Sequence, residues 1–377
     1  MNWKIPLFKI YWEKDDIESV TKIISRGSYW TAGPEIEQLE NEIAKFVGAK
    51  YSLLFNSGTS ALHSVLSAHD IVNGEVIIPS FTFISTANSV VLSNNKPIFA
   101  EIEEESYGLE LENVKEKINR RTKAIIPVHY GGAPCKRIKA LKEIAEDYNI
   151  LLIEDAAESL GAKINNEMVG NFGHSSMFSF CQNKVITGGE GGVIVTDSKE
   201  IHRKLKLICS HGRVENKNGF FSTTKELDYI QAGYNYRMSS ITASLILSQL
   251  KKIDKIIELR RRKADYYNKK LSKLKFVKIP VELKNCYNVY QMYTIQTGNN
   301  KIRRKLQEDL SRAGIMTKVY FEPIHIKTFY RNRFNYKEGD LPITEEISRK
   351  VLTLPLYPTL SYKEIDYVFD IIKNSCG

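Results

Sequence analysis

The sequence predicts an α/β protein built on a mainly parallel sheet with helices on both faces. Up to about residue 200, short apolar runs alternate with segments of helical periodicity, as in parallel strands joined by crossover helices. From about Ile241 to Leu274 the pattern is helical. A chain of 377 residues is also long enough for two domains. We therefore expect a large domain over residues 1–250, with an N-terminal arm, and a smaller α+β domain over residues 251–377.

The expected strands are short apolar runs. They are Tyr51–Phe55, Glu75–Pro79, Pro97–Ala100, Ala124–Val128, Ile150–Ile153, Met177–Phe180 and Gly192–Thr196. The helices expected between them are Ser60–His69, Phe83–Ser93, Ile138–Tyr148 and Glu200–Cys209. Beyond residue 274 we expect a strand over Tyr287–Gln296 and helices over Lys301–Ala313 and Tyr362–Ile372. Sheets of this kind bind ligands in the loops at the carboxyl ends of their strands.

The composition is that of an ordinary globular protein, with 42% hydrophobic and 26% charged residues. Apolar runs are too short for a membrane span, and Met1–Asp16 has no apolar core of a secretory signal. The five cysteines are scattered without a C-x-x-C motif, which argues against a disulfide scaffold or a zinc site. We expect a cytoplasmic protein without a metal.

The net charge of +10 has three interpretations. Nucleic-acid binding needs basic residues clustered on one face, whereas here they are spread along the chain. The one dense run, Lys251–Lys263, alternates with apolar residues and is interpreted first as a solvated helical face. A mildly positive field that attracts anionic small molecules is the third possibility.

The first candidate loop is Asn56–Leu62, which follows an apolar strand and opens a helix. Gly58 allows a tight turn, and Thr59 and Ser60 bring hydroxyls to a helix N-terminus, where free N–H groups can bind a phosphate. The alternative is an ordinary N-cap.

The second loop follows the apolar run Ile150–Ile153. It places Asp155 at the carboxyl end of a central strand. A carboxylate there can bind a metal, orient a histidine or pair with a protonated ring nitrogen. The alternative is again a helix N-cap.

The third loop runs from Ser179 to Gly192 and carries Lys184 beside four glycines that allow close backbone approach. A lysine can bind phosphate or form a Schiff base, although a lone lysine is usually a solvated charge. No Walker A motif surrounds it. Together, a phosphate cradle, an acid and a lysine are what a pyridoxal 5'-phosphate site needs.

The chain also resembles a known family from Gly33-Pro34 to Leu354-Pro355-Leu356. The motifs are S-G-T-S-A-L, P-S-F-T-F, E-D-A-A-E-S-L-G-A, S-F-C-Q-N-K-V-I-T-G-G-E-G-G, G-Y-N-Y-R-M and P-I-H. They are similar to those of the DegT/DnrJ/EryC1/StrS sugar aminotransferases. The resemblance implies the type I fold of pyridoxal-phosphate enzymes, the fold of aspartate aminotransferase.

The resemblance implies roles for individual residues. Lys184 would be the Schiff-base lysine and proton shuttle, Asp155 the partner of the pyridinium, and Phe83 the aromatic residue stacked on the ring. The phosphate would be held by Gly58, Thr59, Ser60 and Ser179 and, from a neighbouring subunit, by Asn235.

Glu158 stands where many members carry glutamine near the phenolic oxygen of the cofactor, which a carboxylate would repel. His325 would face the substrate from the same neighbour, and Trp30 and His211 are further substrate candidates, His211 opening a basic loop toward a diphosphate. The active unit would be a homodimer with shared sites.

The implied function is amino transfer from glutamate to a nucleotide-linked keto-sugar in surface polysaccharide synthesis. The loop around Lys184 looks most like members that aminate C4 of a 4-keto-6-deoxy sugar, such as perosamine synthases, while C3 amination stays open. A branch with histidine in place of this lysine resembles sugar dehydratases, so Lys184 favours transamination. A lyase or dehydratase is the second hypothesis, and a nucleic-acid-binding regulator the third.

Overall fold

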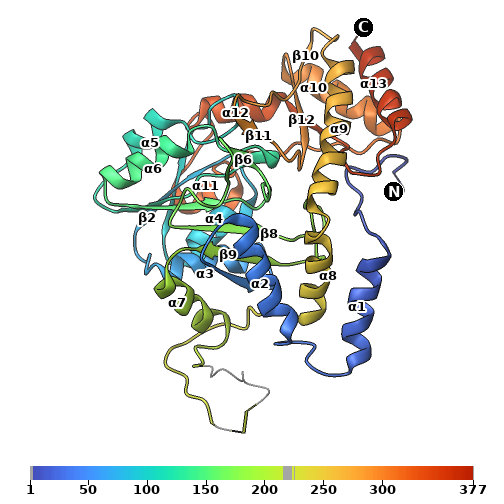
Figure 1. Ribbon diagram of the computed structural model, residues 1–377. Coiled ribbons are helices and arrows are strands. Elements are labelled where there is room, and N and C mark those ends of the chain that lie inside the picture. Colours follow the sequence, from blue (N-terminus) through green and yellow to red (C-terminus); the bar gives the residue numbers. More distant parts are fainter. Residues whose placement is uncertain (1–2, 215–222, 225, 377) are drawn as a thin grey trace.

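A seven-stranded sheet forms the centre of the larger body of the molecule (Figure 1). This computed structural model describes residues 3–214, 223, 224 and 226–376. In spatial order the strands are β1 (Tyr51–Phe55), β9 (Gly192–Thr196), β8 (Ser175–Ser179), β5 (Leu151–Asp155), β4 (Thr122–Ile125), β2 (Glu75–Pro79) and β3 (Lys96–Ala100). β9 is antiparallel to both of its neighbours, and the remaining pairs are parallel. The prediction of a mainly parallel sheet is confirmed.

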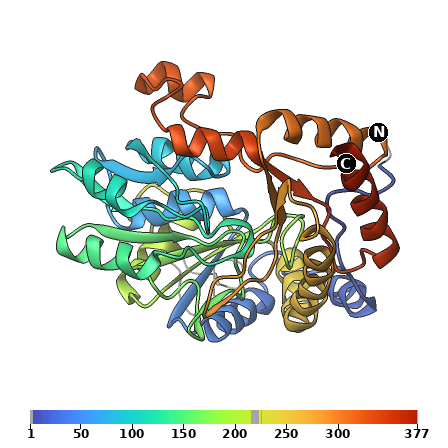
Figure 2. The same cartoon turned by 90° about the horizontal axis from the view of Figure 1, so that it is seen from above.

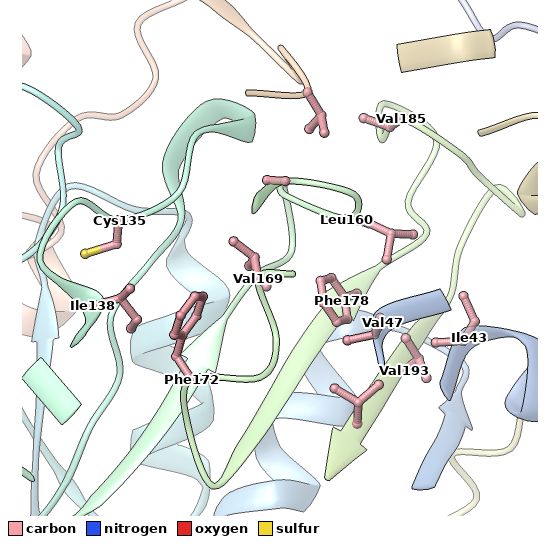
Figure 3. Close-up of a cluster of buried hydrophobic side chains, with 14 of the residues drawn as sticks. Ile43, Val47, Cys135, Ile138, Leu160, Val169, Phe172, Phe178, Val185 and Val193 are labelled. Carbon is pink, nitrogen blue, oxygen red and sulfur yellow. The ribbon is translucent and has the colours of Figure 1, made fainter. Parts of the chain in front are cut away.

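Helices cover both faces of this sheet, as the view from above shows (Figure 2). Apolar residues on one face pack against α2 (Pro34–Val47), α5 (Leu111–Lys117), α6 (Ile138–Asp147) and α8 (Ser240–Leu250). Those on the other face pack against α3 (Gly58–Ala68), α4 (Ile84–Leu92), α7 (Lys199–Cys209) and α11 (Thr328–Phe334). Successive strand residues alternate between the two clusters, so Leu54 joins the first while Phe55 joins the second. Figure 3 shows the first cluster, where Phe172 and Phe178 lie among aliphatic side chains.

A smaller body is built on a second, antiparallel sheet. It consists of β10 (Val277–Lys278), β12 (Tyr293–Thr297) and β13 (Val351–Leu354). This sheet packs against α9 (Ile253–Leu271), α10 (Asn300–Arg312) and α13 (Tyr362–Cys376). α12 (Pro342–Lys350) also contacts this sheet. The hairpin of β6 (Lys163–Ile164) and β7 (Glu167–Met168), to which β11 (Cys286–Tyr287) adds a third strand, packs instead into the first cluster of the large body through Ile164.

The N-terminal arm joins the two bodies. Ile5 is buried in the small core, where its N–H donates to the carbonyl of Gly314 at 3.1 Å. The chain then descends to α1 (Lys14–Arg26), which lies beside α8 in Figure 1. Contacts therefore cross residue 250 in both directions, and the domain boundary there stays a prediction.

One prediction was wrong and another was wrong in part. The strand expected over Tyr287–Gln296 is divided between two sheets, because Tyr287 pairs with β6 while β12 begins only at Tyr293. The solvated face expected over the basic run holds for Lys251, Lys255 and Arg262, which are exposed. It is wrong for Lys252, which binds Asp15 and Asp16 at 2.5 and 3.0 Å, and for Arg260, which is only 3% exposed. Within the described part of the chain, no helix is both long and apolar enough to cross a membrane.

Candidate active site

The three candidate loops meet at one edge of the large sheet. β1, β5 and β8 run in the same direction, so their carboxyl ends share this edge, and the reversed β9 begins there. Phe55 pairs with Gly192, and Gly192 pairs with Ser179, so one row of residues joins the ends of three strands. Register in the sheet therefore brings the loops together.

The N-terminus of α3 forms a cradle at the end of this row. Ser57 is the N-cap, and its hydroxyl accepts from the Ser60 N–H at 3.1 Å. The N–H groups of Gly58 and Thr59 in the first turn have no intrahelical acceptor and carry the positive end of the helix dipole. A Cβ at Gly58 would lie 3.2 Å from Ser179 Cβ, and one at Gly192 would lie 2.5 Å from the Ser57 carbonyl oxygen. Glycine at both positions keeps the cradle open.

The hydroxyls predicted to hold the phosphate have different environments. The Ser60 hydroxyl donates to Asn56 Oδ1 at 2.7 Å and accepts from the Ser57 N–H, so it closes the helix cap. The Thr59 hydroxyl contacts the Ser85 hydroxyl at 2.7 Å. The Ser179 hydroxyl accepts from the Cys181 N–H at 3.3 Å. Their binding of a phosphate stays a prediction.

Asp155 is the last residue of β5, the central strand, and is 4% exposed. Its carboxylate accepts from the Thr86 hydroxyl at 2.7 Å and from the Ala157 N–H at 3.2 Å. Burial raises the pKa of the Asp155 carboxyl, and these two hydrogen bonds act against that rise. In the described part of the chain no cationic side chain contacts it within salt-bridge distance. The site thus holds a buried acid that a cationic ligand atom would stabilise.

Lys184 lies in the connection between β8 and β9. Its Nζ is 3.6 Å from Glu158 Oε1, and both side chains are largely buried. Glu158 Oε2 accepts from the Gly131 N–H at 2.8 Å. The carboxylate at position 158 is therefore held by a backbone donor and faces the lysine. Its place near the phenolic oxygen of a cofactor stays a prediction.

Several other predicted residues are exposed in the single chain. The exposed fractions are 59% for Phe83 and 49% for Trp30, and Asn235 and His211 are also exposed. The Asn235 carbonyl accepts from Asn56 Nδ2 at 3.4 Å, beside the cradle. The basic loop that His211 opens includes residues 215–222 and 225, which lie outside the described residues.

His325 is fully buried in its own chain. Its Nδ1 lies 2.8 Å from the Ser80 hydroxyl, whose oxygen also accepts from the His325 N–H at 3.0 Å. Burial lowers the pKa of the ring, and in a neutral ring whose Nε2 donates to a carboxylate, Nδ1 accepts from the Ser80 hydroxyl. The opposite nitrogen, Nε2, lies 3.1 Å from Glu345 Oε1 and donates to it. Both ring nitrogens make hydrogen bonds, so the ring links the segment around residue 325 to Ser80 at the end of β2 and to Glu345 of α12. A substrate contact from a neighbouring subunit stays a prediction.

Sequence reasoning missed Thr86, the hydrogen-bond partner of Asp155. Thr86 lies three residues after Phe83, in the first turn of α4. This spacing could have placed its hydroxyl on the same side of the helix as Phe83. Tyr320 was also missed. It lines a small cavity with Asn183, the residue before the lysine, and burial and the charge of Glu158 raise the pKa of its hydroxyl.

Comparison with known proteins agrees with this geometry. Residues 11–373 match the DegT/DnrJ/EryC1/StrS aminotransferase family. The chain belongs to this family. GDP-perosamine synthase of Vibrio cholerae is 32% identical over 373 residues, which cover 98% of both chains. The DegT/DnrJ/EryC1/StrS fold is equally clear in solved structures: PseC of Helicobacter pylori, an aminotransferase involved in pseudoaminic acid biosynthesis, matches with a TM-score of 0.92 and 26% identity over 98% of each chain.

A third relative shows the fold alone. The PLP-form of the putative sugar aminotransferase Spr1654 from Streptococcus pneumoniae has a TM-score of 0.89 at 21% identity, covering 100% of this chain and 98% of that one. As a DegT/DnrJ/EryC1/StrS protein with these neighbours, the chain is a sugar aminotransferase with the type I fold.

The residues present fit pyridoxal 5'-phosphate. The cradle of α3 offers N–H donors to a phosphate, and the buried Asp155 offers a carboxylate to a protonated ring nitrogen. Lys184 offers the amine that binds an aldehyde. The polar groups therefore match the phosphate, the ring nitrogen and the aldehyde of this cofactor.

Proposed function

We propose that this protein uses pyridoxal 5'-phosphate to transfer an amino group from glutamate to a nucleotide-linked 4-keto-6-deoxy sugar. The proposal rests on one observation: Lys184, Asp155 and the cradle at the N-terminus of α3 lie together at one edge of the large sheet. The relative in V. cholerae, named GDP-perosamine synthase, supports a sugar of this class. The product would enter surface polysaccharide synthesis.

Each of the three groups has one task in this proposal. The cofactor, when bound, supplies an electron sink for the negative charge that develops at the substrate carbon. Asp155 would keep the cofactor's ring nitrogen protonated, because a desolvated carboxylate gains most from a cation placed against it. Lys184 Nζ would hold the aldehyde carbon and then move a proton at the substrate carbon. Glu158 would hold the lysine amine in place between those steps.

We also propose a homodimer with shared active sites. Trp30, Phe83 and Tyr234 expose 49%, 59% and 46% of their surface in the single chain, and exposed aromatic residues are enriched where protein partners bind. A second copy would cover them and bring its own Asn235 to the cradle.

The first experiment is an absorption spectrum of the purified protein with pyridoxal phosphate, before and after glutamate. A visible band that fades on adding glutamate, and that Lys184→Ala lacks, is the expected result. A panel of nucleotide-linked 4-keto and 3-keto sugars then identifies the acceptor. A band indifferent to glutamate would favour a lyase or dehydratase, and no band at all would overturn the proposal.

Shared sites are tested by mixing two inactive variants, Lys184→Ala and Asn235→Ala. If Asn235 acts across the interface, each mixed dimer has one intact site, and an equimolar mixture should recover about a quarter of the wild-type activity. No recovery after verified subunit exchange would place Asn235 in its own site.

A further inference from the structure

The peptide group in front of Lys184 is held from two sides. The Lys184 N–H donates to the Cys181 carbonyl at 2.9 Å. On the other edge of the same peptide, the Asn183 carbonyl oxygen accepts from Gln291 Nε2. Because a peptide group is planar, these two hydrogen bonds together hold the peptide plane and the Lys184 Cα at its end, which is where the lysine side chain begins.

Gln291 reaches this loop from the small body. It lies just before β12 and is 5% exposed. The side-chain nitrogen must face Asn183, because a carbonyl oxygen can only accept. Gln291 Oε1 is buried without a hydrogen-bond partner among the described residues. A buried amide with an unsatisfied oxygen is costly to the fold, so Gln291 is poorly explained as a packing residue.

Arg260 of α9 holds the segment that carries Gln291. Its guanidinium is buried without a carboxylate partner in the described part of the chain, and its Nη1 lies 3.3 Å from each of the carbonyl oxygens of Tyr290, Gln291 and Leu356. Arg260 and Lys184 also line one small cavity behind the lysine loop. A chain of contacts thus runs from α9 through residue 291 to the lysine.

We propose that Gln291 is a positioning residue for Lys184 and that Arg260 keeps Gln291 in place. The inference deepens the proposed function and rests on it only for the part that concerns catalysis. The small body would then take part in aiming the lysine, although Lys184 itself belongs to the large body.

The test uses Gln291→Met, which keeps the side-chain length and removes the donor. Gln296→Met is the matched control, because Gln296 is also a buried glutamine whose Nε2 makes one hydrogen bond, to the Tyr107 hydroxyl at 2.9 Å. In the cofactor-free full-length protein, amide hydrogen exchange over residues 181–189 should become about tenfold faster in Gln291→Met and stay unchanged in Gln296→Met. Arg260→Lys should change exchange in the same direction.

A second readout uses the enzyme with pyridoxal phosphate bound. Gln291→Met should lower kcat about ten- to a hundredfold with little change in KM for the sugar, and should shift the pH at which the visible absorption changes. If Gln291→Met fails to fold, Gln291→Asn, which keeps the amide but shortens it, replaces it in both measurements. Unchanged exchange over residues 181–189 would overturn the proposal. Faster exchange in a protein that binds no pyridoxal phosphate would instead overturn the proposed function and leave the positioning intact.

Discussion

Replacing Gly192 by alanine should weaken the phosphate cradle while leaving the lysine and the acid in place. A Cβ at this position would lie 2.5 Å from the Ser57 carbonyl oxygen, 2.6 Å from its carbon and 2.7 Å from the Gly58 nitrogen. All three are backbone atoms at the start of α3, so no side-chain rotation can relieve the contact. The cradle itself must move.

The size of the movement follows from these distances. Ordinary contacts of a Cβ begin at 3.4 Å, so the N-terminus of α3 must shift by about 1 Å, an overpacking that costs about 1–3 kcal/mol. A misplacement of about 1 Å in a binding site can cost about a hundredfold. We therefore expect the Kd for pyridoxal phosphate to rise about ten- to a hundredfold.

The assay compares pyridoxal phosphate with pyridoxal, which lacks the phosphate. Gly192→Ala should weaken binding of the first and leave the second nearly unchanged. Gly189→Ala is the matched control, since Gly189 has a φ of +87° and nothing within 4 Å of its Cβ position. That variant should lose about 1–2 kcal/mol of stability through backbone strain without discriminating between the two ligands.

Two results would refute the reasoning. If Gly192→Ala binds pyridoxal phosphate as tightly as the wild type does, the row Phe55–Gly192–Ser179 does not set the cradle. If it weakens both ligands equally, the damage lies on the side of the lysine or in the whole fold.

Three further variants test single groups. Asp155→Asn should leave the cofactor-free protein at least as stable as the wild type in thermal unfolding, because burial raises the pKa of the Asp155 carboxyl and makes its charge costly, yet it should abolish amino transfer. Burial raises the pKa of Glu40 from 4.5 to about 7, so the folded protein loses stability as the pH rises through that range. The free energy of unfolding of Glu40→Gln, measured in urea, should therefore exceed that of the wild type by at most about 3 kcal/mol at about pH 8 and should equal it at about pH 4. Glu158→Gln removes the anion 3.6 Å from Lys184 Nζ and should lower, by about one unit, the pH at which the bound cofactor changes its visible absorption, measured by spectroscopic titration.

The sequence predicted the large sheet well because its strands are apolar runs between turns. The bounds of β1, β2 and β9 agree with the structure, and Asp155 does end the central strand. Strand-end residues are predictable in this way because a parallel sheet gathers them at one edge.

Predictions failed where the outcome depended on distant partners. Tyr287 and Tyr293 belong to one apolar run, yet they pair with β6 and β13 respectively, in different sheets. Arg260 stands among charged residues in the sequence, and only the packing of α9 against residues 290, 291 and 356 buries it. Periodicity reports that a residue is buried, but it does not report which segment covers it.

The reversed strand β9 also determines when the edge of the large sheet can assemble during synthesis. β1 is an edge strand whose hydrogen-bonded neighbour in the sheet is β9, although about 140 residues separate them in the chain. On the ribosome, β1 therefore leaves the exit tunnel long before its neighbour exists, and its unpaired edge needs protection from other nascent chains. The cradle cannot form until Thr196 has emerged, because β9 must pair with β1 to place Gly192 against Ser57. A phosphate can therefore bind at the cradle only after both strands have been synthesised.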